Sequence, residues 1–437
     1  MTGTWRQVRS FNRCVQLLAV NQLGINLGFY MLMPYLANHL SSGLGMAAWT
    51  VGLVLGVRTL SQQGMFLVGG MLADRFGYKS MIVAGLVLRT VGFALLGFVD
   101  TLPALLVASV LTGLAGALFN PSVRAYVAAE AGERRVDAFA VFNVFYQAGI
   151  LIGPLVGLLL IAADFRTVCL VAAAVFAALT IVQVRLLPNQ PREEADPGRA
   201  TGLAGVRADW RQVVGNRPFM LFSLAMIGSY VLSSQIYLAL PLQAARVLGP
   251  SGGDVGSSVL FALSAVVAVI GQVRVTSWVK RRWNSGRSIT VGLALMGAAF
   301  LPLALTAHLF VYRTGASAWD GAVALAPLLL ATVVLTVGTV VAYPFEMDTI
   351  VALSGERLVA THYGLYNTLS GIGITLGNLG TGAIWGAAAA WDLPALPWLA
   401  LIATGIVCTT AIAALARSGK LTAAPTVVPA AKGAATL

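Results

Sequence analysis

The chain is organised around one charged stretch, Gly70-Met71-Leu72-Ala73-Asp74-Arg75-Phe76-Gly77-Tyr78-Lys79. It predicts a turn with one acid and two bases between two long apolar runs, about residues 51–73 and 80–99. Each run is long enough to cross a bilayer as a helix, which takes about 20 residues. The glycines at both ends of the turn allow close approach of another backbone and a sharp bend. Asp74 is placed either to pair with Arg75 or to cap the positive end of a neighbouring helix.

The composition indicates an integral membrane protein. Of the 437 residues, 58% are hydrophobic and 10% are charged, whereas soluble domains carry about 25% charged residues. The formal net charge of +12 would suggest nucleic acid as a partner in a soluble protein. Here the accumulation of bases on the cytoplasmic side of a membrane protein accounts for it better. We therefore expect a lipid bilayer and no nucleic acid as surroundings.

Apolar runs recur twelve times along the chain, near residues 14–40, 49–73, 80–99, 102–127, 138–162, 166–187, 218–244, 257–279, 288–311, 322–347, 361–388 and 396–416. The longest polar segment, Pro188 to Arg217, predicts a linker with a short amphipathic helix around Arg207–Val214. The Ala/Pro/Thr-rich end of the chain predicts disorder. The expected divisions are an N-terminal six-helix half, a cytoplasmic linker, a C-terminal six-helix half and a cytoplasmic tail: residues 1–187, 188–217, 218–416 and 417–437.

The distribution of basic residues predicts the orientation in the membrane. With the N-terminus inside, 22 of the 28 Lys and Arg residues fall on cytoplasmic segments, and only Arg166, Arg246 and Arg313 fall outside. This asymmetry predicts that both termini are cytoplasmic. The first apolar run is too long for the core of a cleavable signal peptide. We expect a multi-pass protein of the plasma (inner) membrane.

An internal repeat relates the two halves. Two segments recur 223 residues later, Asn120-Pro121 as Tyr343-Pro344 and Gly132-Glu133-Arg134 as Gly355-Glu356-Arg357. Three further positions recur 224 residues later, Asn143 as Asn367, Gly149 as Gly373 and Gly153 as Gly377. Parallel duplication of this kind places a substrate site between the two halves, near the middle of the bilayer.

The charged stretch resembles the loop signature between the second and third helices of the major facilitator superfamily, G-x-L-a-D-R/K-x-G-R/K-R/K. It departs from the signature at Tyr78, where a second base is usual. The resemblance implies an all-α integral membrane fold of twelve transmembrane helices in two pseudo-symmetric halves. It also implies a gating loop made by Gly70, Asp74, Arg75, Gly77 and Lys79.

The fifth apolar run carries a second resemblance, to the antiporter signature G-x-x-x-G-P-x-x-G-G. It matches at Gly149, Gly153, Pro154 and Gly157 and fails at Leu158. In the family this signature is associated with exporters. Small residues four apart let helices pack closely, and we expect this run to approach the second helix or the interface between halves. The arginine that antiporters place in the fourth helix is absent.

The first half also resembles the MdtH-like multidrug exporters of the drug/proton antiporter family. The likeness covers the run Val51 to Gly64, the segment Leu27-Gly28-Phe29-Tyr30, and the segment Phe119-Asn120-Pro121. It implies a cavity between the halves, and polar or aromatic side chains of the expected cavity helices are candidates to line it. These are Asn21, Asn26, Tyr30, Arg58, Gln62, Asn143, Tyr146, Gln147, Tyr230, Ser234, Gln235, Tyr237, Tyr366 and Asn367.

Such a lining suits amphipathic or aromatic ligands of loose specificity. The alternative for several of these residues is hydrogen bonding or packing between helices. Arg58 and Arg89 are intramembrane cations, which usually face the interior of a bundle.

Candidates for energy coupling lie in the tenth run. The first Asp or Glu of the chain is Asp74, so the first helix has no carboxylate to carry a proton. Glu346 and Asp348 can be partly buried, and burial favours the protonated form of a carboxyl group. Arg124 stands at the equivalent depth in the repeated fourth helix. Glu346 or Asp348 therefore either carries the proton or latches the cytoplasmic side to Arg124, and Arg89 belongs to the same group of candidates.

These features describe a secondary active exporter of small, lipophilic or amphipathic compounds. The expected process is multidrug efflux, with antibiotic resistance, by alternating access and proton-coupled antiport. The alternative is a carrier of an anionic metabolite, a siderophore or a lipid that uses the intramembrane arginines. We find no Walker A run, metal-ligand cluster or catalytic constellation. We expect a monomer that is not an enzyme, with a small-molecule substrate and protons as partners and no cofactor besides the proton gradient.

Overall fold

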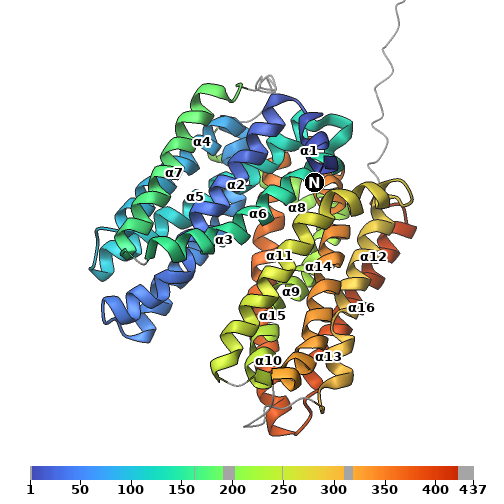
Figure 1. Cartoon of the computed structure of the whole chain (residues 1–437). Coiled ribbons are helices and arrows are strands. Elements are labelled where there is room, and N and C mark those ends of the chain that lie inside the picture. Colours follow the sequence, from blue (N-terminus) through green and yellow to red (C-terminus); the bar gives the residue numbers. More distant parts are fainter. Residues whose placement is uncertain (1, 162, 190–201, 249, 310–317, 422–437) are drawn as a thin grey trace, which may run out of the picture.

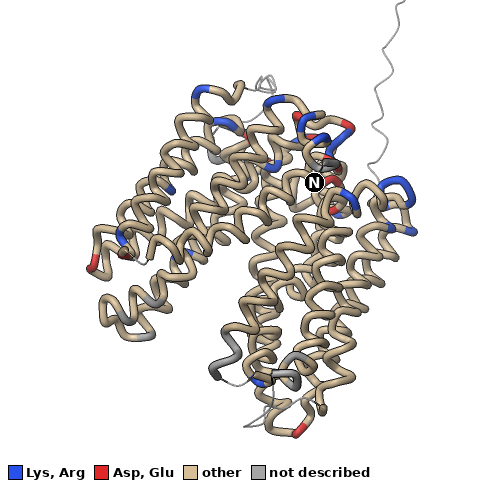
Figure 2. Tube along the Cα trace, viewed as in Figure 1, with Lys and Arg blue, Asp and Glu red and all other residues tan. Residues whose placement is uncertain are grey.

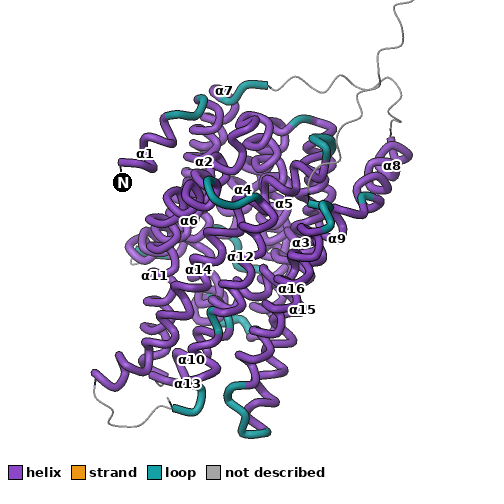
Figure 3. The backbone as a smooth tube through the Cα atoms, turned by 90° about the vertical axis from the view of Figure 1, so that its right-hand side faces the viewer, coloured by secondary structure: helices purple, strands orange, loops and turns teal. Residues whose placement is uncertain are grey.

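The computed structural model describes residues 2–161, 163–189, 202–248, 250–309 and 318–421. This part of the chain is helical and contains no strand (Figure 3). The N-terminal part forms α1 (Thr2–Arg9), α2 (Arg13–Asn38), the π-helical turn η1 (His39–Gly43), α3 (Ala48–Phe76), α4 (Tyr78–Leu96), α5 (Leu102–Ala131), the 3₁₀ turn η2 (Gly132–Arg134), α6 (Arg135–Ile161) and α7 (Phe165–Leu186).

The C-terminal part begins with α8 (Gly202–Gly215), inside the predicted linker. It continues with α9 (Arg217–Ser234), the 3₁₀ turn η3 (Gln235–Tyr237), α10 (Ala239–Leu248), α11 (Pro250–Lys280), α12 (Ser285–Ala298), α13 (Leu301–Thr306), α14 (Ala318–Ser354), α15 (Val359–Ala390) and α16 (Leu396–Arg417). The helix predicted around Arg207–Val214 is confirmed as α8.

The apolar runs coincide with helices. Length and hydropathy mark ten candidate membrane spans within the described residues. One of them, Leu102–Ile161, comprises both α5 and α6, and α15 is not among the ten although it is 32 residues long. The all-α membrane fold is confirmed, whereas the number of crossings, twelve, stays a prediction.

The helices form two groups, α2–α7 and α9–α16 (Figure 1). The groups approach each other at the end where the N-terminus lies and diverge toward the other end. Lys and Arg gather at the first end (Figure 2), which we call the basic end. It holds α1, α8 and the junction of α3 and α4, and α1 and α8 lie beside the bundle there (Figure 3).

The internal repeat is visible in the packing. Gly132 and Gly355 follow α5 and α14 with φ angles of 51° and 59°, a backbone conformation that favours glycine. In α6, Gly149 and Gly153 pack on α2, and in α15 their counterparts Gly373 and Gly377 pack on Ile227 and Val231 of α9. Glycines related by the repeat thus pack α6 on α2 in one half and α15 on α9 in the other. The predicted boundaries of the halves remain predictions, and residues 422–437 of the predicted tail lie outside the described residues.

The charged stretch that opens the sequence analysis is mostly helical rather than a turn. Helix α3 continues to Phe76 and α4 begins at Tyr78, so Gly77 alone joins them, with φ 92°. Side chains of the stretch therefore project from the last turn of a rigid helix. Their direction is set by the packing of α3, which decides what Asp74 and Arg75 can reach.

Candidate functional site

Asp74 joins the two halves at the basic end. Its carboxylate accepts hydrogen bonds from the backbone N–H groups of Ala360 and Thr361, at 3.1 and 2.7 Å, and from Thr361 Oγ1 at 2.6 Å. These N–H groups belong to the first turn of α15, where a helix presents unsatisfied donors and positive partial charge. The sequence left two alternatives for Asp74, pairing with Arg75 or capping a neighbouring helix. The structure shows the second of them.

Gly70 permits this contact. A Cβ atom at Gly70 would lie 2.1 Å from the carbonyl oxygen of Ala360, a separation no side chain can occupy. One helical turn from Asp74 on the same face of α3, the glycine lets the backbones of α3 and α15 touch. A larger residue here would hold the N-terminus of α15 out of reach of Asp74.

Arg75 turns away from Asp74 and binds the linker. Its Nε and Nη2 atoms donate to Oδ2 of Asp209 in α8, at 3.1 and 2.8 Å. Asp209 is buried, so this two-pronged pair fixes α8 against the end of α3. Lys79, on the first turn of α4, is half-buried. The five predicted gating residues therefore lie together at the basic end, although Arg75 acts through a partner that sequence reasoning missed.

The contact of α3 with α15 extends inward along one face of each helix. A Cβ atom at Gly364 would lie 2.4 Å from the carbonyl oxygen of Phe66, and one at Gly371 would lie 2.7 Å from the side chain of Gln63. The hydroxyl group of Thr368 donates to the carbonyl oxygen of Gln63 at 3.2 Å. We call this line of contacts, from Asp74 to Gln63, the seam.

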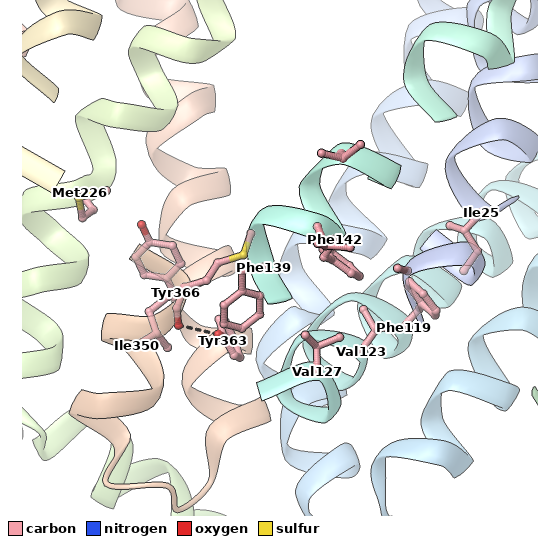
Figure 4. Close-up of a cluster of buried hydrophobic side chains, with 14 of the residues drawn as sticks. Ile25, Phe119, Val123, Val127, Phe139, Phe142, Met226, Ile350, Tyr363 and Tyr366 are labelled. Atoms are coloured by element: carbon pink, nitrogen blue, oxygen red, sulfur yellow. Dashed lines mark hydrogen bonds between the residues drawn. The ribbon is translucent and has the colours of Figure 1, made fainter. Parts of the chain in front are cut away.

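Aromatic and charged side chains close the basic end beside the seam. Phe139 of α6 lies against Tyr363 of α15 (Figure 4), with ring centroids 6.5 Å apart. Arg135 donates to Asp348 at 3.0 Å and to Glu356 at 2.6 Å, and Lys280 donates to Asp137 at 2.9 Å. Each of these contacts joins one half to the other.

The latch predicted for Arg124 is wrong. Its Nη1 atom donates to Oδ1 of Asn367 at 2.8 Å, and no hydrogen bond or ion pair within the described residues joins it to Glu346 or Asp348. Asp348 instead pairs with Arg135. The sequence offered no means to prefer Arg135, because Arg124 and several other bases stand at the same end and the choice depends on how the halves dock.

Beyond Gln63 the same faces of α3 and α15 are uncovered. Continuing at helical spacing, Leu60 of α3 and Leu379 of α15 are 71% and 67% exposed. A Cβ atom at Gly56 or Gly382 would meet nothing within 4 Å. The helices are thus in contact toward the basic end and apart toward the opposite end.

The fifth-run glycines pack within the N-terminal half. A Cβ atom at Gly149 would lie 2.6 Å from that of Asn26, and one at Gly153 would lie 2.9 Å from that of Tyr30. At Gly157 the nearest atom would be the carbonyl oxygen of Met31, at 2.1 Å. The partner is therefore α2, the first apolar run. The predicted partner, the second helix or the interface between halves, is wrong.

Among the three polar residues at the middle of α2, Asn26 joins this helix to α6. Asn26 donates to the carbonyl oxygen of Tyr146 in α6 at 2.8 Å and accepts from Gln22 at 3.1 Å. Asn21 is buried, and neither atom of its amide has a hydrogen-bond partner. Hydrogen bonding between helices, one of the two alternatives for Asn26, is what the structure shows.

Two cations occupy the interior of the N-terminal half. Cζ of Arg58 and of Arg89 lie 5.4 and 5.2 Å from the ring centroid of Phe29, and Arg89 also lies 5.7 Å from that of Phe176. Arg58 donates to Gln62 at 3.3 Å and to Thr59 at 3.1 Å. A charge at the centre of a bilayer costs about 2.5–3.5 kcal/mol on insertion scales, and a desolvated cation–π contact recovers about 2 kcal/mol. The aromatic contacts thus offset much, but not all, of the cost of these charges.

A carboxyl group occupies the interior of the C-terminal half. Glu346 is buried and accepts a hydrogen bond from the hydroxyl group of Tyr230 at 2.9 Å. Its Oε2 atom has no hydrogen-bond partner. The ring of Tyr230 stacks on Tyr343 and meets the edge of Tyr366, with centroids 5.6 and 5.8 Å apart. Glu346 therefore sits in an aromatic enclosure without a cation bonded to it, the kind of environment in which a carboxyl group exchanges a proton.

The remaining residues predicted to line a cavity differ in how far they are buried. Tyr237 is 59% exposed. Ser234 and Gln235 reach Asn378 of α15, at 3.1 and 3.4 Å, a residue that sequence reasoning missed because a single Asn in an apolar run carries little signal. Three further candidates are buried on α6 and α15, namely Asn143, Tyr366 and Asn367. Three others are half-buried on α3 and α6, namely Gln62, Tyr146 and Gln147. Among the described residues, no group of three His, Cys, Asp or Glu side chains could hold a metal ion.

Comparisons with known proteins agree with this architecture. The family model of the Major Facilitator Superfamily matches residues 18–378. The chain belongs to the major facilitator superfamily. It is 51% identical over 409 residues to the uncharacterized MFS-type transporter Rv0849 of Mycobacterium tuberculosis, covering 94% of each protein. It is 29% identical over 406 residues to the multidrug resistance protein MdtH of Yersinia enterocolitica, covering 92% of this chain and 93% of the relative.

Solved structures of two other transporters share the fold. The human organic anion transporter MFSD10 (TETRAN) superposes with a TM-score of 0.68 at 15% identity, covering 92% of this chain and 99% of that protein. An auto-inhibited peptide transporter of the POT family superposes with a TM-score of 0.65 at 16% identity, covering 93% and 97%. The resemblance to the superfamily and to MdtH-like proteins that the sequence motifs predicted is confirmed.

Proposed function

We propose that this transporter exports small lipophilic or amphipathic compounds, as a multidrug efflux protein that contributes to antibiotic resistance. Membership of the superfamily and the likeness to multidrug resistance proteins support this proposal. The glycine and proline pattern of α6, which resembles the exporter signature, supports the direction of transport. The exposed aromatic and apolar side chains near the opening suit ligands of loose specificity.

We place the protein in the inner membrane as a monomer, with the basic end in the cytoplasm. In that orientation the seam closes the cytoplasmic side, and the uncovered faces of α3 and α15 open outward. Alternating access then requires Asp74 to release α15 while the outer parts of the same two faces come together. Gly56 and Gly382 leave room for that approach, as Gly70 and Gly364 do at the basic end.

Glu346 is the residue that supports the proposal of proton coupling. It is 1% exposed, receives one hydroxyl donor, and has neither Arg124 nor another cation bonded to it. Asp348, two residues along the same helix, is bound to Arg135 and fits the latch role instead. A carboxyl group that is free of a permanent ion pair can load a proton on one side of the membrane and release it on the other.

Proteoliposomes test this assignment. In Glu346→Gln we expect uphill export driven by an imposed pH gradient to be lost, while downhill substrate exchange continues, because glutamine mimics the protonated side chain. Asp348→Asn is the matched control on the same helix: it weakens the latch and should slow both modes alike. Uphill export that persists in Glu346→Gln would exclude Glu346 as the essential proton carrier. Absence of any pH-driven transport in the wild type, across cationic, neutral and anionic compounds, would refute proton antiport.

A further inference from the structure

Arg58 and Arg89 are two cations that share one aromatic ring. Their guanidinium carbons lie 5.4 and 5.2 Å from the centroid of Phe29. The edge of Tyr30 meets the same ring, with centroids 5.2 Å apart. Like charges repel, so this arrangement is stable only if something nearby supplies negative charge or accepts their hydrogen bonds.

No acid of the N-terminal half fills that need. The six Asp and Glu residues between 1 and 189 all stand at helix ends or in the connections between helices: Asp74, Asp100, Glu130, Glu133, Asp137 and Asp164. Asp74 is held by α15, and Asp137 by Lys280. Helices α2 and α7, which provide the aromatic rings around the two arginines, contain no acid. No acid of the N-terminal half is therefore placed to balance the charge of the pair.

Several of the donors of the pair are also unused. Arg89 is 4% exposed, and neither its Nε nor its Nη1 atom has a hydrogen-bond partner. Nε of Arg58 lacks a partner as well. A buried donor left without an acceptor costs free energy, so an acceptor that arrives with the substrate would bind strongly here.

Arg58 lies where a substrate can reach it. The seam ends at Gln63, and Arg58 is five residues, or about 7.5 Å of helix, further toward the open end of α3. It is half-buried, whereas Arg89 lies deeper and also contacts Phe176. Arg58 is thus the accessible member of the pair, and Arg89 adds a second positive charge at the same ring.

We propose that Arg58 and Arg89 form a binding site for the oxyanion headgroup, a carboxylate or a phosphate, of an amphipathic substrate. The planar fork of Arg58 donates to the oxyanion, Arg89 strengthens the positive potential, and the apolar body of the substrate lies against Phe29 and Tyr30. This proposal rests on the proposed transport function and names its substrate class as anionic amphiphiles. The headgroup belongs either to a soluble compound or to an anionic membrane lipid, which share this chemistry.

Three probes with one apolar body and different charges test the site: 2-naphthoate, its neutral amide 2-naphthamide, and the cation 2-naphthylmethylammonium. Binding is measured on purified protein in phosphatidylcholine nanodiscs, without a pH gradient. We expect naphthoate to bind at least tenfold more tightly than the amide, and the cation to bind weakest. In Arg58→Gln the ratio of naphthoate to amide affinity should fall to about one, and Arg58→Lys should restore part of it.

Arg89→Gln should lower the same ratio, a change that a purely structural role would not produce because both probes share one body. Arg274→Gln is the matched control, since Arg274 is an exposed arginine on a membrane helix remote from Phe29; it should keep the wild-type ratio. The proposal is overturned if the wild type binds the cation or the amide as tightly as naphthoate. It is equally overturned if the preference survives in the double variant Arg58→Gln/Arg89→Gln.

Nanodiscs that contain the anionic lipid phosphatidylglycerol distinguish a soluble anionic substrate from a lipid headgroup. If naphthoate affinity is unchanged, the site takes a soluble anion. If the lipid weakens naphthoate binding in the wild type but not in Arg58→Gln, the site takes the lipid headgroup. Because binding is measured without a gradient, a failure of proton coupling leaves the result intact. Proton-driven export of cations combined with no anion preference would refute this inference alone.

Discussion

Single side chains hold the two halves together at the basic end. Asp74 satisfies two backbone donors and one hydroxyl group of α15, 286 residues away in the chain. These bonds combine hydrogen bonding with the attraction of a carboxylate to the positive end of a helix. Arg75 and Asp209 add the linker helix to the same junction. The closure of the basic end therefore depends on a few charges in the last turn of α3.

Replacing Asp74 tests that dependence. In Asp74→Asn the shape of the side chain persists but its charge is lost, and losing about 1–2 kcal/mol of capping free energy shifts the balance between closed and open seams by roughly tenfold. We expect the initial rate of transport in proteoliposomes to fall sharply while expression and substrate binding survive. Asp164→Asn is the control, because Asp164 caps α7 away from the seam. Wild-type turnover in Asp74→Asn would contradict the gating role.

At the scale of elements, close contacts between helices depend on glycine. Lipid is as apolar as the helix surfaces, so helices in a membrane associate largely through close packing. In α6 the three glycines from Gly149 to Gly157 bring its backbone against α2, and Pro154 lies between them. The same spacing in α15 packs on α9. The pattern that resembles an exporter signature thus has a structural basis within each half rather than between the halves.

Filling one of these positions should disrupt the pair of helices. A Cβ atom at Gly153 already lies 3.0 Å from the carbonyl oxygen of Leu27, and overpacking a tight contact costs about 1–3 kcal/mol. We expect Gly153→Leu to lower the thermal midpoint of the purified protein and to block transport. Gly380→Leu makes the same change where a Cβ meets nothing within 4 Å and should leave the midpoint unchanged. Equal midpoints and transport rates in the two variants would remove the physical basis of the α6 pattern.

At the scale of the whole molecule, the two halves share one continuous face of α3 and of α15. At the basic end the two helices cover each other along the seam. Beyond Gln63 the same faces are exposed, as Leu60 of α3 and Leu379 of α15 show. The alternating access that we propose opens and closes the molecule along this same pair of helices. In the orientation we propose, the covered end of this face is cytoplasmic and the exposed end faces outward.

Cysteine labelling tests whether the two ends of this face open and close together. Because the three native cysteines are buried, the wild-type protein gives the background level of labelling. Leu60→Cys should react with a membrane-impermeant maleimide added from outside, and adding Asp74→Asn should slow the reaction, because weakening the seam favours the state in which the outer faces meet. Ile181→Cys, an exposed position on α7, is the control for lipid exposure. Identical labelling rates at Leu60→Cys with and without Asp74→Asn would rule out coupled closure of the two ends.

The sequence by itself determined the all-α membrane fold, the positions of the helices and the internal repeat, because run length, hydropathy and glycine spacing are local properties of the chain. It also limited Asp74 to two alternatives, pairing with Arg75 or capping a neighbouring helix, and grouped the predicted gating residues in one stretch. Only the tertiary structure decided that Asp74 caps α15, that Arg135 rather than Arg124 binds Asp348, that α6 packs on α2, and that Arg58 and Arg89 share Phe29. A membrane helix is apolar on nearly every side, so its sequence does not reveal which face meets which neighbour. Those choices arise from the rotation and docking of helices that are far apart in the chain.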